Sequence, residues 1–318
     1  MPPDESPGNK PSMRPSPRAF LIASLRGVGQ VDLQPSLMTS LLILIALFVG
    51  GWRIGVFALI GTIVSTGAAL VFGVGRKLIA QGLEGFSGLL TGIAIFVYLG
   101  DHLASYLLAI AGGLLCTAVT AALTTWLTPY KLSALTAPFC LVAGGILVGA
   151  PVFRHVWYHP AAAPAPNPST HTTWSELWQG FFKNVSEVFL VGSWQSGLIM
   201  LIGLAFSGWA VALFAAAGSI VALFTAWALG ASAQMIGEGL YGYNAVLVGI
   251  ALGAMFLRRT PWNALYTLAG AAAATFLTAT TTAFFAPFNG HTLTWPFIFT
   301  TWVLLLAAPL LSRFPLKQ

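Results

Sequence analysis

Two polar side chains stand alone where long apolar stretches begin, and they are 157 residues apart. Gln30 lies in Gly-Gln-Val-Asp-Leu at 29–33, and Glu187 lies in Ser-Glu-Val-Phe-Leu at 186–190. Amide and carboxyl oxygens accept hydrogen bonds, and a carboxyl beside a membrane-length apolar run is costly enough to indicate function. We expect Gln30 and Glu187 to face each other across a pore for a small polar solute. The alternative for Glu187 is a solvated carboxylate at the interface end of a helix.

The remaining reactive side chains favour no catalytic or metal site. Asp32 is expected at the membrane interface, while Glu84 and Glu238 fall in turn regions and are expected to have loop roles. Cys116 and Cys140 lie in apolar runs, which is typical of buried packing. No cluster has metal-ligand spacing, no glycine-rich loop could hold a phosphate, and no nucleophile stands with a base. We therefore expect no catalytic residues, no metal and no cofactor.

The composition indicates an integral membrane protein built from helices. The 318 residues are 57% hydrophobic and only 7% charged, whereas soluble domains are about a quarter charged. The apolar runs are longer than strands and do not alternate, so helices rather than a barrel are expected to cross the lipid bilayer. The formal charge of +6 is better explained by basic cytoplasmic loops than by nucleic-acid binding.

The chain divides into two halves with the same order of segments. We expect a disordered tail at 1–17, a first repeat at 18–157, an extracellular or periplasmic linker at 158–173, a second repeat at 174–312 and a tail at 313–318. Each half opens with an amphipathic segment, at 18–29 and 174–186. Five apolar segments follow in each half, and the third is short for a full span. They cover 33–50, 54–73, 86–99, 103–127 and 137–153, then 188–206, 209–231, 244–257, 262–286 and 295–312.

The halves align without a gap at an offset of 157, with 24 identities in the 64 positions from Val31 to Ala94. This indicates an internal duplication. An odd number of spans per half would invert the second repeat. With the N-terminus in the cytoplasm, eleven of the fourteen Lys and Arg residues fall inside. We therefore expect a multi-pass protein of the plasma (inner) membrane with both termini cytoplasmic and a solute site between the repeats.

Several motifs resemble the urea transporter (urea channel) family, of which the chain is identified as a bacterial member. Arg-Gly-Val-Gly-Gln-Val at 26–31 is similar to the family's Gly-x-Gln-Val motif. Leu-Thr-Ala-Pro-Phe at 135–139 is echoed by Thr-Trp-Pro-Phe at 294–297, which is followed by Thr301-Trp302. The resemblance covers nearly the whole chain beyond residue 18.

The resemblance implies a homotrimer with one pore in each protomer, and ten transmembrane helices plus two tilted half-membrane helices in two inverted-topology repeats of five spans. It places Gln30 and Glu187 at the two ends of a selectivity filter and hydroxyls of Thr136 and Thr294 near its centre. It also implies that the filter has apolar walls and, on each side, an aromatic slot. The walls are Val31, Val188, Leu90 and Leu247, and the slots contain Phe86 and Tyr243, with Leu33 and Leu190 where the family often has an aromatic residue.

For several of these residues a purely structural role is also possible. The threonine hydroxyls could bond their own helix backbone, and Leu90 and Leu247 could pack against lipid or core. All five histidines fall in predicted outside segments, where they either tune an external mouth by protonation or have no special role.

The leading hypothesis is passive, channel-type transport of urea through a narrow pore between the repeats. The alternative is a proton-coupled secondary transporter of a small neutral amide or related solute, with Glu187 as the titrating group. A membrane enzyme is a third class, which the sequence does not favour. The expected partners are urea, the lipid bilayer and two further copies of the chain, and no nucleic acid.

Overall fold

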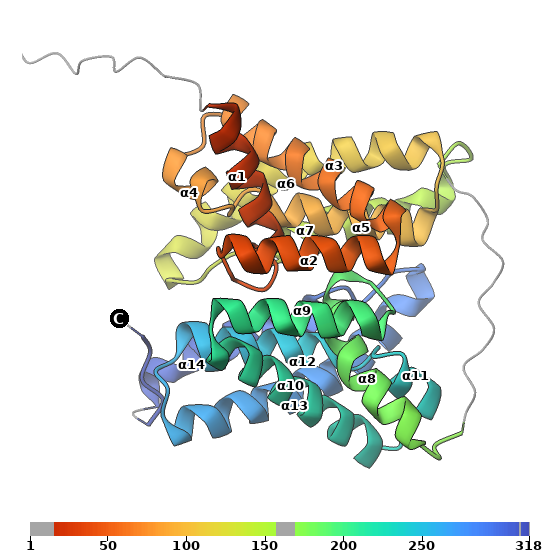
Figure 1. Cartoon of the computed structure of the whole chain (residues 1–318), viewed down its shortest axis with the longest axis vertical. Helices are drawn as coiled ribbons and strands as arrows, with labels where there is room; N and C mark the ends of the chain where they lie inside the picture. Colours follow the sequence, from red (N-terminus) through yellow and green to blue (C-terminus); the bar gives the residue numbers. More distant parts are fainter. Residues whose placement is uncertain (1–15, 157–168, 312, 318) are drawn as a thin grey trace, which may run out of the picture.

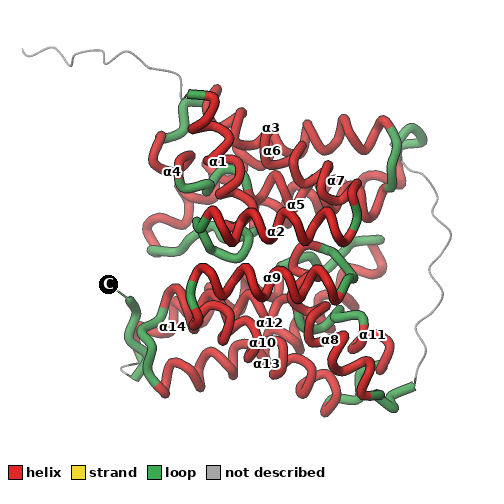
Figure 2. The backbone as a smooth tube through the Cα atoms, viewed as in Figure 1, coloured by secondary structure: helices red, strands yellow, loops and turns green. Residues whose placement is uncertain are grey.

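The computed structural model describes residues 16–156, 169–311 and 313–317, and over those ranges the protein is helical (Figure 1; Figure 2). The first half contains α1 (Pro17–Gln30), α2 (Leu37–Gly50), α3 (Trp52–Val71), α4 (Arg76–Ala80), α5 (Phe86–Leu99), α6 (Leu103–Leu127), η1 (Thr128–Tyr130), α7 (Ala137–Gly149) and η2 (Ala150–Val152). The second half contains α8 (Trp174–Ser186), η3 (Glu187–Phe189), α9 (Trp194–Ser207), α10 (Trp209–Ala228), α11 (Ala233–Gly237), α12 (Tyr243–Val248), η4 (Gly249–Phe256), α13 (Pro261–Phe285), η5 (Ala286–Phe288), α14 (Trp295–Ala307) and η6 (Ala308–Leu310). The all-helical prediction is confirmed.

Helix starts follow local capping chemistry, which explains where they differ from the apolar segments. The predicted segment 33–50 begins as α2 only at Leu37, because Pro35 precedes Ser36, whose hydroxyl accepts from Thr39 N. In α8, Thr173 and Glu176 form a reciprocal capping box. Most of the predicted tail 1–17 and of the linker 158–173 lies outside the described residues.

Among the described residues, four helices are long and apolar enough to cross a membrane: Trp52–Val71, Leu103–Tyr130, Trp209–Ala228 and Pro261–Phe288. A fifth candidate is the pair Trp174–Phe189 and Trp194–Ser207, which is bent by 75°. The other apolar helices, including α5, α7 and α14, are shorter than a full span.

The two halves of the chain stack on one another, with α2 running along α9 (Figure 1). Hydrogen bonds from two buried hydroxyls stabilise this contact. Thr39 Oγ1 donates to Gly203 O at 2.8 Å, and Ser196 Oγ donates to Ala46 O at 2.8 Å. The interface between the halves is therefore hydrogen-bonded as well as packed.

Glycines let α5 and α12 pack backbone to backbone against the long helices beside them. A Cβ on Gly61 of α3 would overlap the carbonyl oxygen of Gly88 in α5, and a Cβ on Gly218 of α10 would overlap Ala245 O in α12. Small residues allow this close approach between helices in membranes. The contacts fix the position of α5 and α12, which carry several of the predicted site residues.

The second half differs from the first in the helix that continues α12. α5 stays α-helical to Leu99, whereas α12 gives way to the π-helix η4. The end of η4 is held by residues 313–317: Lys317 N donates to Phe256 O at 2.9 Å and Arg258 N donates to Pro315 O at 3.0 Å. π-Helical turns often mark functional sites.

Candidate functional site

The most central polar contact joins the two halves of the chain through two threonines. Thr136 is the N-cap of α7, and Thr294 is the N-cap of α14, and neither side chain caps its own helix. Their hydroxyl oxygens instead lie 2.7 Å apart, and both residues are 2% exposed. The two short helices thus start at a shared point inside the protein, each with a proline in its first turn.

A strained residue precedes each threonine. Leu135 has φ 49° and Leu293 has φ 45°, in the left-handed region that leucine rarely adopts. Leu293 O accepts from Tyr243 Oη at 2.8 Å and from Asn244 Nδ2 at 3.4 Å. Such strained backbone persists only where the surroundings hold it and is common at binding sites.

Gln30 is the last residue of α1 and is 7% exposed. Its Nε2 donates to Gln81 O at 2.8 Å, in the turn before α5. This bond fixes the amide and leaves its Oε1 atom as an acceptor that no described residue engages. Leu33, three residues on, has φ 61° and turns the chain toward α2.

Glu187 takes the corresponding place after α8, where the chain turns at Leu190 with φ 57°. The side chain is half-buried, and no hydrogen bond or ion pair ties its carboxyl to another described residue. A Cβ on Gly192 would lie 3.2 Å from Glu187 Oε1, so the carboxyl rests beside a glycine backbone. The carboxyl oxygens are thus free to accept hydrogen bonds from a solute.

The predicted apolar wall lies in one continuous core cluster that also holds Leu135, Cys140 and Leu293. Leu90 and Leu247 are 0% exposed, so they face the protein interior and not lipid. Leu33 and Leu190 pack against the same cluster and are partly buried. The buried members of the predicted wall and slots are Val31, Val188, Leu90, Leu247, Phe86 and Tyr243.

Three features near these residues escaped the sequence reasoning. Cys140 Sγ lies 3.1 Å from Thr294 Oγ1. The rings of Tyr98 and His291 stack at 3.7 Å; burial lowers the pKa of His291 to about 4. Asp32 is 2% exposed and its Oδ2 has no partner among the described residues, so its carboxyl is buried in the protein.

The reading of the cysteines as buried packing residues is confirmed for both, since each is a free, buried thiol. Glu84 does lie in a turn, but it is only 6% exposed and therefore not a solvated loop residue. Within the described part of the chain, no group of three or more His, Cys, Asp or Glu residues could hold a metal ion.

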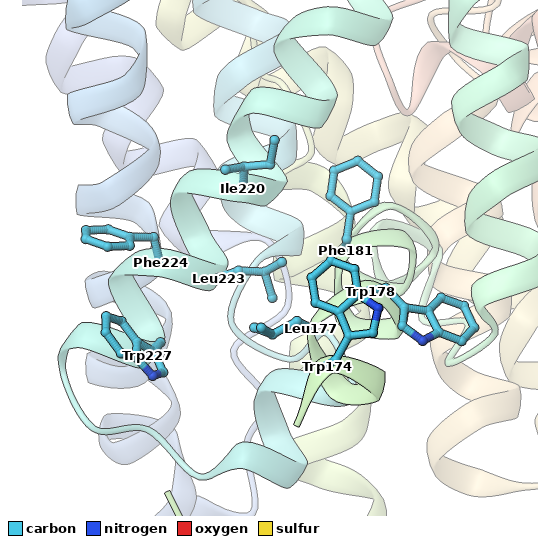
Figure 3. Close-up of a pocket in the computed structure, with 8 residues that line it drawn as sticks. All are labelled: Trp174, Leu177, Trp178, Phe181, Ile220, Leu223, Phe224 and Trp227. Atoms are coloured by element: carbon cyan, nitrogen blue, oxygen red, sulfur yellow. The ribbon is translucent and has the colours of Figure 1, made fainter. Parts of the chain in front are cut away.

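A separate apolar pocket of about 510 Å³ lies between α8 and α10 (Figure 3). Its residues are aromatic or aliphatic: Trp174, Leu177, Trp178, Phe181, Ile220, Leu223, Phe224 and Trp227. It offers no carboxyl, amide or hydroxyl group, so it is chemically unsuited to a small polar solute. The threonine pair, Gln30 and Glu187 remain the better candidate site.

The candidate site combines hydrogen-bonding groups at three places with the apolar side chains of the core cluster. Gln30 and Glu187 offer acceptor oxygens, and the threonine pair offers hydroxyls. A neutral planar solute with N–H and C=O edges can bind such groups while its faces contact apolar side chains. An ion loses far more hydration free energy in such surroundings and is disfavoured.

Comparisons with known proteins agree with this chemistry. A family model described as "Urea transporter" matches residues 21–309. Urea transporter 1 of Ovis aries is 27% identical over an alignment of 317 residues that covers 96% of this chain and 82% of that protein. Urea transporter 1 of Rattus norvegicus and that of Mus musculus are each 28% identical over an alignment of 311 residues that covers 94% of this chain and 80% of each relative.

Proposed function

Because the chain belongs to the urea transporter family, we propose that urea crosses the membrane through its centre, past the Thr136–Thr294 pair. The chain is a membrane transport protein and not an enzyme, and its function is passive transport of urea. The family gives no support to proton coupling through Glu187.

The observation that carries the proposed path is the 2.7 Å contact between Thr136 and Thr294. It brings together two helix starts from opposite halves of the chain. Two buried hydroxyls withheld from helix capping provide hydrogen-bond donors and acceptors inside the protein. Urea needs both, because it has one carbonyl and two NH2 groups.

We place the ends of the path at Gln30 and Glu187. The anchored amide of Gln30 presents Oε1, and the unbonded carboxyl of Glu187 presents two oxygens. Between either end and the centre, the apolar walls are Val31, Val188, Leu90 and Leu247, and the aromatic slots hold Phe86 and Tyr243 beside Leu33 and Leu190. Acceptors at both ends replace the water that urea gives up, and the flat walls contact its faces.

The proposed membrane arrangement is two inverted repeats, at 18–157 and 174–312, with ten transmembrane helices and two tilted half-membrane helices. Backbone conformations support it, because unusual positive φ angles recur at matching places. Leu33 and Leu190, Gly73 and Gly230, Gly82 and Gly239, and Leu135 and Leu293 all show them.

We further propose a homotrimer in the plasma (inner) membrane, with one pore per protomer and both termini in the cytoplasm. The homotrimer is what the motif resemblance implies, and the distribution of eleven Lys and Arg residues on one predicted side supports the orientation. Light scattering of the purified protein tests the oligomer, and labelling of engineered terminal cysteines in intact cells tests the orientation.

The decisive experiment is stopped-flow urea flux in liposomes, with formamide and acetamide as comparators. Thr136→Val and Thr294→Val each remove one hydroxyl and nearly preserve volume, so each should lower urea permeability about tenfold, the upper range of a lost hydrogen bond. Thr275→Val is the matched control, because that buried hydroxyl donates to Ala271 O of its own helix at 3.0 Å. Wild-type flux in both folded variants would contradict the proposed path, and flux that requires a pH gradient would contradict passive transport.

A further inference from the structure

Cys140 joins the central threonine pair from one turn along α7. It lies four residues after Thr136, so the two side chains share a helix face. Its Sγ is 3.1 Å from Thr294 Oγ1, which is itself 2.7 Å from Thr136 Oγ1. All three residues are 2% exposed. The thiol and the two hydroxyls therefore form one buried chain of hydrogen bonds.

We propose that Cys140 is a positioning residue of the urea path, whose thiol donates to Thr294 and thereby occupies a lone pair that this hydroxyl would otherwise leave unpaired in the path. This inference rests on the proposed function, because it assumes that urea passes the threonine pair.

The number of hydrogens in the three groups limits which of them can donate. Each of the three groups has one hydrogen, and the two contacts use two of them, so one remains free. Thr294 Oγ1 takes part in both contacts with a single hydrogen, so at least one neighbour must donate to it. Because sulfur is a weak acceptor and a hydroxyl oxygen a good one, the thiol donates and Thr294 accepts.

The direction of the thiol hydrogen determines how many hydrogen-bond donors and acceptors stay free for a solute. The thiol hydrogen occupies one lone pair of Thr294. One of the two hydroxyl hydrogens then lies in the contact between Thr136 and Thr294. The second hydroxyl hydrogen is not used in that contact and can be donated to a solute. A neighbouring hydroxyl oxygen still has a lone pair that can accept a hydrogen bond. One free donor and two free lone pairs remain, which match the carbonyl and the N–H groups of urea. Without the thiol, Thr294 has a further unpaired lone pair in a buried site, which a water molecule can occupy in competition with urea.

Cys116 provides a matched comparison within the same chain. It is also buried, and its Sγ lies 3.1 Å from the hydroxyl of a different threonine, Thr91. It is the other of the two cysteines in the sequence, and its hydrogen bond is to Thr91 and not to the threonine pair. A general effect of losing a buried thiol should therefore appear at both positions, whereas an effect on the path should appear only at Cys140.

The first test measures flux. Cys140→Ala should lower urea permeability about fivefold, the loss expected for one hydrogen bond, and Cys140→Ser should restore most of it because a hydroxyl can also donate to Thr294. Cys116→Ala should conduct at the wild-type rate. Equal rates for wild type and folded Cys140→Ala would overturn the proposal, and so would a Cys140→Ser protein as slow as Cys140→Ala.

The second test needs no change at Cys140. In Cys116→Ala protein the S–H stretching band in the infrared comes from Cys140 alone, and it should shift when urea is added. In Cys140→Ala protein the remaining band of Cys116 should not shift. A Cys140 band that is unchanged by urea would overturn the proposal.

The two levels of inference can fail separately. If Thr136→Val and Thr294→Val lower urea flux while the Cys140 tests fail, the path stands and the role of the thiol is wrong. If the threonine variants conduct normally, the path and the role of Cys140 are both overturned.

Discussion

Replacing Gly61 by alanine tests whether the close contact of α3 with α5 sets the shape of the path. The added Cβ would lie nearer to Gly88 O than 3.0 Å, a distance that real Cβ atoms essentially never show. That oxygen is backbone and cannot swing aside. Relieving the overlap therefore requires α3 and α5 to separate by about an ångström, and overpacking of this kind costs about 1–3 kcal/mol.

The displaced segment carries the predicted wall. Gly88 stands between Phe86 and Leu90, which are both buried in the core cluster. We expect Gly61→Ala to lower the unfolding midpoint in detergent by several degrees and to lower urea permeability in liposomes severalfold. Thermal unfolding monitored by tryptophan fluorescence and stopped-flow flux measure the two effects on the same preparation.

Gly67 is the matched control because it lies on the same helix and a Cβ there has nothing within 4 Å. Gly67→Ala should be neutral or more stable by up to about 1 kcal/mol, from helix propensity alone, with unchanged flux. A Gly61→Ala protein as stable and as permeable as Gly67→Ala would refute the reasoning that this contact positions the wall.

Two further predictions concern Glu187, at one end of the proposed path, and the pH dependence of stability. Glu187→Gln should keep urea permeability within about threefold of wild type, because the amide retains an acceptor oxygen, while Glu187→Leu should lower it about tenfold; abolished flux in folded Glu187→Gln would instead favour a titrating role. Because the pKa of His291 is lowered to about 4 from 6.5, the unfolded chain binds the proton more readily, so stability should be full above about pH 6.5 and fall as the pH drops toward 4. His291→Gln should remove that part of the acid sensitivity in thermal unfolding measured from pH 8 to pH 4, and an identical pH profile for the variant would refute the assignment.

The sequence predicted helices well where capping and apolar length agree. The amphipathic segment predicted at 174–186 coincides with α8, whose first turn is capped by Thr173. The π-helix η4 could not be predicted, because its run from Gly249 to Phe256 is apolar throughout and carries no periodicity that separates π from α geometry.

The site was predicted less completely than the helices, for reasons that differ by residue. The burial of Asp32 was not predicted because the residue is polar, although Phe189, 157 residues further on, is apolar and fully buried. The contact of Cys140 with Thr294 joins residues 154 positions apart, a separation that no local pattern spans. Its spacing of four residues from Thr136 was the available hint, since that spacing places two side chains on one helix face.

The pairing of Thr136 with Thr294 has a consequence for biosynthesis. α14 is the last α-helix of the described chain, so every earlier helix is synthesised before Thr294. A nascent or truncated chain that ends before residue 294 holds Thr136 and Cys140 but lacks the oxygen to which both hydrogen-bond. The centre of the proposed path is thus complete only when synthesis is nearly finished.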